Sequence, residues 1–457
     1  YALSHYGTFD CGRGCPFGCS FCTVINVQGR KMRYRSVDKI LAKIRENYHK
    51  HRIKSYFFTD DNFCRNKNWE AIMDGLIEMR EKDNMPIHYM MQIDTQSHKV
   101  PRFVEKAGRS GCQQAFIGME SLNEENLIAV QKTQNKTGEF RDLVNAYHSV
   151  GVVTHLSYII GFPFDTVESV KKDVDRLVSL GSGQTSFFMM TPLPGAMDFK
   201  SVIERKMIRD ADLNNYDTFH ETHRHARMNP GEWLESYEDA WRKFYSVENM
   251  KKILRNIGRE PYWGVFFNFI WYKNGFEVEG GHPMIHGFIR FKGRLERRSG
   301  FPVEGRREYF RRRINDVRCV IKGWWKLVKE LEEVWLGTRA RRPDDQKLAT
   351  VLESMPDRHW REMSLDQLKE VYRRAGLESP AGWKLWLSRV NIFRDNITPT
   401  RRAFALFWAH EGEKFRHTQF LRVNYLKMMF ALIQETALII MFIHGLLTCG
   451  HIGGRDS

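Results

Sequence analysis

The first 195 residues alternate short apolar segments with amphipathic ones, and this alternation limits the fold more than any other feature of the chain. Alternation of strands and helices predicts an α/β protein with a parallel sheet and right-handed crossovers. Six units in fewer than 200 residues favour a partial (β/α)6 barrel, with a doubly wound open sheet as the alternative. The candidate strands are rich in β-branched or aromatic residues and are bounded by polar residues or glycine; they are His5–Asp10, Ser55–Thr59, Ile87–Asp94, Gln114–Met119, Val152–Ile160 and Thr185–Met190.

Helical patterns fill the spaces between these strands. Val37–Tyr48 follows Ser36, and Val167–Leu180 follows Thr166, so both serine and threonine are candidate N-caps. Trp69–Lys82 carries apolar residues at helical spacing. We therefore expect helices over these three ranges.

Beyond Gly195 the alternation stops, and we expect three parts. Residues 1–195 form the α/β core, residues 196–338 form a basic helical and aromatic extension that closes the core, and residues 339–457 form an α-helical C-terminal region. Within them, Arg306–Leu336 predicts a basic amphipathic helix. Ser364–Gln367 has the spacing of a capping box at the start of a helix that stops at Gly376.

Charge and hydropathy are unevenly spread over the chain, whose formal net charge is +16. Arg290–Arg342 holds seventeen lysines and arginines against seven acidic residues. It predicts attraction to phosphates on a membrane or a nucleic acid, or else a solvated helical face. Met428–Cys449 is an apolar run of 22 residues that includes Glu435. A carboxylate inside a bilayer is costly, so a buried or dimerising helix is favoured over a membrane-associated one.

Four of the eight cysteines lie within twelve residues, in the segment Cys11-Gly-Arg-Gly-Cys15-Pro-Phe-Gly-Cys19-Ser-Phe-Cys22. Such crowding is typical of a metal or cluster site in a reducing compartment, so we expect a cytoplasmic protein. A zinc site would usually take two separated pairs of ligands. Three thiolates spaced closely in one loop can instead bind three irons of a cubane and leave the fourth iron open.

The spacing Cys-x3-Cys-x-aromatic-Cys, with Phe21 as the aromatic residue, resembles the motif of the radical S-adenosylmethionine (SAM) superfamily. The resemblance implies a [4Fe–4S] cluster on Cys15, Cys19 and Cys22, SAM on the open iron, and reductive cleavage of SAM to a 5′-deoxyadenosyl radical. A fourth ligand from Cys11 would instead make the chain an iron–sulfur electron carrier or a basic scaffold. A saturated cluster could not bind SAM, so we expect Cys11 to end the first strand.

Polar residues also follow the other candidate strands, where barrel enzymes place their functional groups. Examples are Asp60, Asp94, Glu120 and Ser121. Burying such groups without a partner is costly, so their recurrence at one edge of the sheet predicts a polar ligand there. The alternative for each is a helix N-cap.

These strand ends resemble the radical SAM group whose members often carry a cobalamin-binding domain, including radical methyltransferases and the anaerobic magnesium-protoporphyrin ester cyclases. The matching segments are Phe57–Asn62, Ile117–Ser121, Ile160–Pro163 and Thr191–Gly195. The resemblance implies radical chemistry at an unactivated carbon of a small or lipid-like substrate, with electrons from a flavodoxin or ferredoxin. By the same resemblance, the candidate SAM contacts are Phe21, Asp60, Glu120, Ser157, Ile160, Gly161 and Pro163.

The Asp-x-His-x-x-Gly motif of the cobalamin domain is missing from this sequence. Its nearest approach, at Asp357 and His359, has Glu362 where glycine is needed. We expect that domain to precede Tyr1, or the protein to work without cobalamin.

Two further hypotheses remain. An RNA-modifying methylthiotransferase could use Arg290–Arg342 to bind RNA, but no small β-barrel domain or second three-cysteine set accompanies it, so we do not expect nucleic acid as a partner. His220, His223 and His225 are candidates for lining a substrate pocket and, with no carboxylates nearby to complete a site, are weaker candidates for binding a metal.

Overall fold

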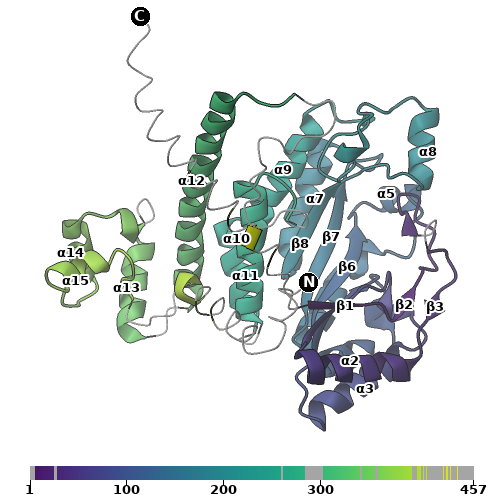
Figure 1. Ribbon diagram of the computed structural model, residues 1–457, viewed down its shortest axis with the longest axis horizontal. Coiled ribbons are helices and arrows are strands. Elements are labelled where there is room, and N and C mark those ends of the chain that lie inside the picture. The colour runs from purple at the N-terminus through teal and green to yellow at the C-terminus, as the bar shows by residue number, and fades with distance from the viewer. Residues whose placement is uncertain are drawn as a thin grey trace, which may run out of the picture. The chain divides into compact units, whose positions relative to one another are not determined.

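The computed structural model describes residues 6–24, 28–258, 261–283, 302–339, 342–355, 359–393 and 399–402, together with single positions between 405 and 440. Its central feature is a six-stranded parallel sheet in the order β1-β4-β5-β6-β7-β8 (Figure 1). The strands are β1 (Tyr6–Phe9), β4 (Ser55–Phe58), β5 (His88–Ile93), β6 (Cys112–Glu120), β7 (Val153–Ile160) and β8 (Gln184–Met189).

All six predicted strands are present, and their bounds differ from the predicted ones by at most two residues at either end. Neighbouring strands pair in parallel throughout. The partial (β/α)6 barrel predicted from the alternation is confirmed. One irregularity lies at the carboxyl end of β6, where the pairing with β7 shifts between Gly118 and Glu120.

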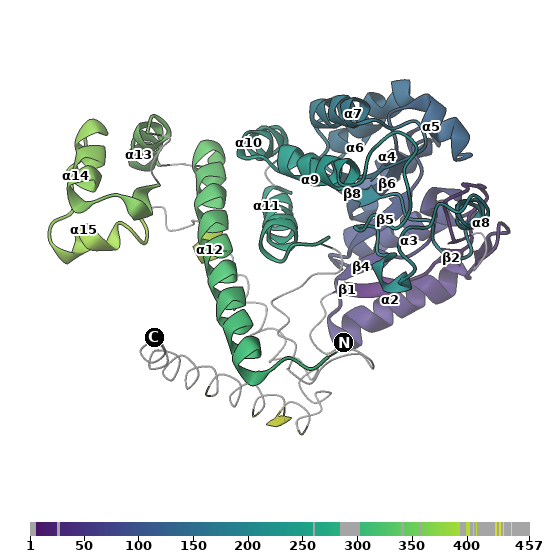
Figure 2. The same cartoon turned by 90° about the horizontal axis from the view of Figure 1, so that it is seen from above.

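The helices of the core follow one another along the outside of the sheet (Figure 2), and each packs against the next in the series α2, α3, α4, α6 and α7. Their side chains bury apolar stripes; in α3, for example, Ile72, Leu76 and Met79 are fully buried. The core helices are α2 (Val37–His51), α3 (Trp69–Glu81), α4 (Phe103–Ser110), α5 (Glu124–Ala129), α6 (Phe140–Ser149) and α7 (Val167–Leu180).

The two predicted N-caps behave differently. The Thr166 hydroxyl accepts a hydrogen bond from the Ser169 amide, and the Ser169 hydroxyl accepts one from the Thr166 amide, so α7 begins with a capping box. Ser36 is the N-cap residue of α2, but its side chain makes no capping hydrogen bond. Both predicted residues occupy the N-cap position, but only Thr166 makes a capping hydrogen bond.

The remaining elements are mostly helical, as predicted, and the capping box of Ser364 and Gln367 is present. The sequence did not predict the short antiparallel pair of β2 (Gly12–Arg13) and β3 (Arg33–Tyr34), nor α11. The helices that follow the core in the described residues are α8 (Met197–Glu204), α9 (Glu232–Phe244), α10 (Val247–Asn256), α11 (Tyr262–Lys273), α12 (Arg306–Arg339), α13 (Pro343–Glu353), α14 (Leu365–Arg374) and α15 (Trp383–Leu387).

Contacts divide the described part of the chain into two compact units, one within residues 4–271 and 330–401 and the other within 272–329. The predicted three-part division at 195 and 338 stays a prediction. The predicted apolar helix Met428–Cys449 lies outside the described residues except at a few single positions. Within the described ranges, no helix has the length and hydropathy needed to cross a membrane.

Candidate functional site

The cysteine loop, residues 11–24, leaves the carboxyl end of β1 and is fixed from several sides. The amide of Gly14 donates to the Asp61 carboxylate over 2.9 Å, and the amide of Ser20 donates to the carbonyl of Val130 over 3.0 Å. The carbonyl of Ser20 in turn accepts from the amide of Asp198 over 3.2 Å. The loop is therefore held at the edge of the sheet where the strands end.

Three thiols of this loop lie near one another. Cys19 is buried, whereas Cys15 and Cys22 are half-buried. Burial raises the pKa of Cys15, and the nearby Cys19 and Cys22 raise it further; burial and Cys19 do the same to the pKa of Cys22. Burial and the neighbouring thiols therefore favour the neutral thiol over the thiolate at Cys15 and Cys22 in the metal-free protein.

A single metal ion and a cubane cluster need different arrangements of ligands. Among the described residues, no three His, Cys, Asp or Glu side chains gather as they would around a single metal ion. In a cubane each of three thiolates binds a different iron, so this absence concerns a site for a single ion.

Cys11 differs from the other three cysteines of the segment. It is fully buried, and burial raises the pKa of its thiol well above the usual range. Its amide donates to the Asp60 carboxylate over 2.7 Å, and Asn66 donates to the same carboxylate over 3.2 Å. Cys11 thus sits in the core at the start of the loop, with Asp60, which is only 1% exposed, beneath it.

A buried ion pair lies at the carboxyl end of β6. Lys132 Nζ lies 2.6 Å from Glu120 Oε1, and the Ser157 hydroxyl donates to Glu120 Oε2 over 2.5 Å. Burial lowers the pKa of Lys132, but Glu120 and Cys19 outweigh it, so the pKa is raised and the ammonium stays charged. A Cβ at Gly118 would come within 2.9 Å of the Lys132 nitrogen, so glycine in β6 leaves room for the pair.

Lys132 also connects the ion pair to the cysteine loop. Its ammonium lies 5.7 Å from the ring centroid of Phe21, the aromatic residue of the cysteine motif. The Phe21 ring packs against Phe162, with centroids 5.6 Å apart. The structure therefore brings Phe21, Glu120 and Ser157 together with a lysine that the sequence did not single out.

The turn Ile160–Pro163, at the end of β7, is fixed by residues from outside it. The Asp165 carboxylate accepts from the amides of Gly161 and Phe162, at 2.8 and 3.0 Å, and Trp233 donates to the carbonyl of Ile160 over 2.8 Å. Gly161 has φ of 107°, and a Cβ there would come within 2.2 Å of the Trp233 ring. Glycine is thus required at this position for both backbone and packing reasons.

The cap alternative for the polar strand-end residues is wrong for three of them. Asp60, Asp94 and Ser121 are not the N-cap residues of the helical turns that follow them. Asp94 instead forms an ion pair with Arg65, at 2.6 Å. Burial raises the pKa of Asp94, but Arg65, Asn62 and the amide of Gln96 together outweigh burial, and the pKa is lowered overall.

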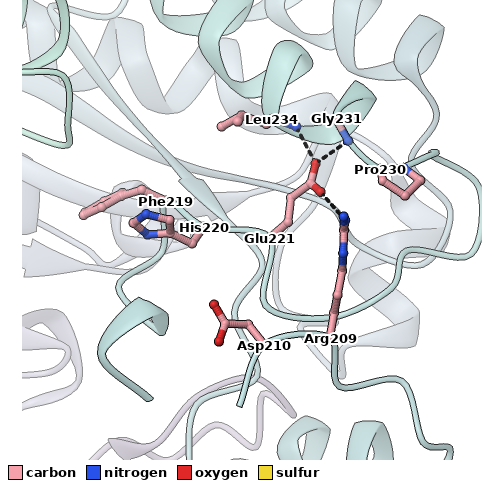
Figure 3. Close-up of a pocket in the computed structure, with 8 residues that line it drawn as sticks. All are labelled: Arg209, Asp210, Phe219, His220, Glu221, Pro230, Gly231 and Leu234. Carbon is pink, nitrogen blue, oxygen red and sulfur yellow. Dashed lines mark hydrogen bonds and ion pairs between the residues drawn. The ribbon is translucent and has the colours of Figure 1, made fainter. Parts of the chain in front are cut away.

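The three histidines do not form one site. His220 bonds to Asp217 at 2.9 Å, His225 bonds to the carbonyl of Phe162 at 3.0 Å, and His223 packs edge-on against Trp233. Of the three, only His220 lines the surface pocket drawn in Figure 3.

That pocket is organised around Glu221. Its carboxylate accepts from the amides of Gly231 and Leu234, at the start of α9, and pairs with Arg209 at 2.8 Å (Figure 3). The first amides of the helix, which could otherwise bind an anion, are therefore already occupied by a side chain of the protein.

Sequence reasoning missed Lys132, Gln134, Asp165 and Trp233. Gln134 Nε2 lies 3.8 Å from Cys19 Sγ, as a donor to sulfur. Asp165 had a local signal, since it follows the turn that its carboxylate closes. Gln134 and Trp233 lie 115 and 73 residues from their partners, and Lys132 lies 12 residues from Glu120 in a segment that carries no motif.

The model of the radical SAM superfamily matches residues 10–177. The matched segment runs from the cysteine loop through α7 and contains the three thiols and the buried ion pair. The chain carries a radical SAM domain.

Curated relatives include methyltransferases. The bacteriochlorophyllide d C-12(1)-methyltransferase of Chlorobaculum tepidum is 28% identical over 263 residues, which cover 56% of this chain and 55% of that protein. An uncharacterized methyltransferase of Pyrococcus horikoshii is 26% identical over 217 residues, covering 47% and 45%. The chain thus spans about half the length of these relatives.

Among solved structures, the radical SAM methyltransferase TsrM from Kitasatospora setae, with cobalamin and a [4Fe–4S] cluster bound, is 18% identical. It aligns over 52% of this chain and 46% of its own, with a TM-score of 0.41. A radical SAM domain implies a [4Fe–4S] cluster and SAM as cofactors, as the cysteine motif predicted.

Proposed function

We propose that Cys15, Cys19 and Cys22 hold a [4Fe–4S] cluster with one open iron, and that the enzyme is a radical SAM methyltransferase acting on an unactivated carbon of a small or lipid-like molecule. When bound, the cluster supplies the electron that cleaves SAM. The observation that supports this most strongly is the loop after β1, which carries Cys15, Cys19 and Cys22 within eight residues inside the segment that the radical SAM model matches. Methyl transfer is supported by the names of the relatives.

Glu120, Lys132 and Ser157 are our candidates for holding the amino-acid end of SAM. That end carries an ammonium and a carboxylate, and a Glu–Lys pair presents one charge complementary to each. Because the pair is buried, these charges are weakly screened and would discriminate strongly between ligands. Phe21 lies beside this pair, and the Ile160–Pro163 turn meets it through Phe162; the roles of Asp60, Ile160, Gly161 and Pro163 as SAM contacts stay predictions.

The experiment that tests this assignment compares Glu120→Gln with the wild-type chain. We expect SAM affinity to fall by about tenfold or more, because a charge-assisted bond of about 1.5–3 kcal/mol is lost, while iron content stays unchanged. Isothermal titration of the anaerobically reconstituted protein measures the affinity. Glu125→Gln is a matched control, since Glu125 is exposed in α5. Normal SAM affinity in the Glu120 variant would contradict the assignment.

We also propose that the enzyme works in the cytoplasm, where a flavodoxin or ferredoxin can reduce it, and that it binds the surface of an anionic membrane. Exposed basic residues of α12 support the membrane contact: Arg306, Arg307, Arg311, Arg318, Lys322 and Lys326. Exposed apolar residues at helical spacing support it too: Leu426, Met429, Phe430, Ile433 and Ile440. Basic and apolar groups together favour an anionic bilayer over water.

The membrane proposal predicts that Phe430→Asp with Ile433→Asp weakens binding to vesicles of phosphatidylglycerol and phosphatidylcholine, as measured by co-sedimentation. Ile128→Asp is the control, because Ile128 is exposed on α5 of the core. Vesicle binding that the double variant leaves unchanged would contradict the proposal. RNA binding without vesicle binding would favour the methylthiotransferase hypothesis instead.

A further inference from the structure

The segment that follows α5 touches the cysteine loop at two places. We name residues 130–135 the brace segment. Its Val130 carbonyl accepts from the amide of Ser20 over 3.0 Å. Its Gln134 side chain donates from Nε2 to the Sγ of Cys19, with nitrogen and sulfur 3.8 Å apart. One contact fixes the backbone beside Cys19, and the other reaches the sulfur itself.

Asn135 anchors the brace segment to the sheet. This residue is 4% exposed, and its Nδ2 donates to the carbonyls of Gly118 and Met119 over 3.0 and 2.7 Å. Its Oδ1 accepts from the Thr95 hydroxyl over 2.9 Å. Both ends of the amide are therefore satisfied by strands β5 and β6 and the turns that follow them. Because Asn135 is fixed in this way, the backbone of the adjacent Gln134 is held beside Cys19.

A donor to a thiolate sulfur has a defined electrostatic effect. It withdraws electron density from the sulfur, and the stabilisation is greater when the attached cluster carries one more negative charge. Hydrogen bonds to the ligand sulfurs therefore raise the reduction potential of an iron–sulfur cluster. The charged Lys132, close to Cys19 and Cys22, acts in the same direction.

We propose that Gln134 is a positioning residue that raises the reduction potential of the cluster through its N–H···S bond to Cys19. This inference rests on the proposed function, because it takes Cys19 to be a cluster ligand. It assigns to a neutral side chain, 115 residues away along the sequence, part of the control over how readily the cluster accepts an electron.

The test is an EPR-monitored redox titration of the full chain, reconstituted anaerobically, without SAM. Gln134→Leu removes the donor at similar size, and Gln134→Glu replaces it with an anion. Thr133→Val is the matched control, because Thr133 is exposed in the same segment. We expect iron content to stay at the wild-type level in all three. The midpoint potential should become more negative in Gln134→Leu, more negative still in Gln134→Glu, and stay unchanged in Thr133→Val.

The outcomes separate the two proposals. A normal iron content with an unshifted midpoint in Gln134→Leu would overturn the role of Gln134 and leave the proposed function standing. Loss of iron from both Gln134 variants would also overturn it, since the residue would then be needed to build the site and not to tune it. Failure of the wild-type chain to bind iron would overturn the proposed function and this inference together.

Discussion

At the scale of single residues, the acid–base behaviour of Asp60 gives a direct check on the start of the cysteine loop. Burial raises the pKa of this carboxyl to about 6, against the amide of Cys11 and the side chain of Asn66, which lower it. An unfolded aspartate has a pKa of about 3.9. The folded state thus binds this proton more tightly than the unfolded state does. The stabilisation of the folded state by this bound proton is complete below a pH of about 4 and is lost as the pH rises through about 6.

Asp60→Asn removes the titrating group but keeps an oxygen acceptor. As the pH rises from about 4 to about 6, we expect the free energy of unfolding of the wild-type chain to fall relative to that of the variant. Above a pH of about 7 the difference between the two should be constant. Urea denaturation of the metal-free protein at several pH values measures this. A difference that stays constant across that range would show that the Asp60 carboxyl does not titrate there.

The site residues divide into those that a sequence can reveal and those that it cannot. Phe21 and the three cysteines lie within eight residues of one another, so a local motif identifies them. Lys132 meets Glu120 only because β6 and the turn after α5 fold back on each other, and Gln134 meets Cys19 across 115 residues. No local pattern encodes such a contact. Lys132 is buried because its charge is paired, but nothing in the local sequence distinguishes it from a lysine on the surface.

At the scale of elements, the two candidate caps provide a matched pair. Thr166 makes a capping bond to the amide of Ser169 at 3.1 Å, whereas the side chain of Ser36 makes none. We expect Thr166→Ala to lower the free energy of unfolding by about 1 kcal/mol and Ser36→Ala to change it by much less. Chemical denaturation of both variants measures the difference. Equal losses in the two would contradict the presence of a capping bond in α7 and its absence in α2.

The elements that could be predicted are those with a strong local pattern. Strand β7 is buried along almost its whole length, so its apolar run stands out. Strands β2 and β3 have two residues each, which is too short for any periodicity. Helix α11 has aromatic and aliphatic residues around most of its circumference, so the 3.6-residue period that would reveal an amphipathic helix is missing.

At the scale of the whole molecule, the radical SAM core and the rest of the chain differ in what their sequences reveal. The chemistry of the core can be predicted from the motif in the cysteine loop. The fold of the core can be predicted from the alternation of six strands with helices. The described residues beyond 200 fold mainly into helices that carry no motif, so their helical character could be predicted in outline but their role could not.

The most direct test of the central claim is EPR spectroscopy of the reduced, anaerobically reconstituted chain, recorded with and without SAM alongside an iron assay. We predict about four irons per chain, a reduced-cluster signal that changes when SAM is added, and the same result in Cys11→Ala. Alanine at Cys15, Cys19 or Cys22 should abolish the signal. A cluster that survives Cys15→Ala but is lost in Cys11→Ala, or a signal that SAM leaves unchanged, would contradict the assignment of an open iron held by these three cysteines.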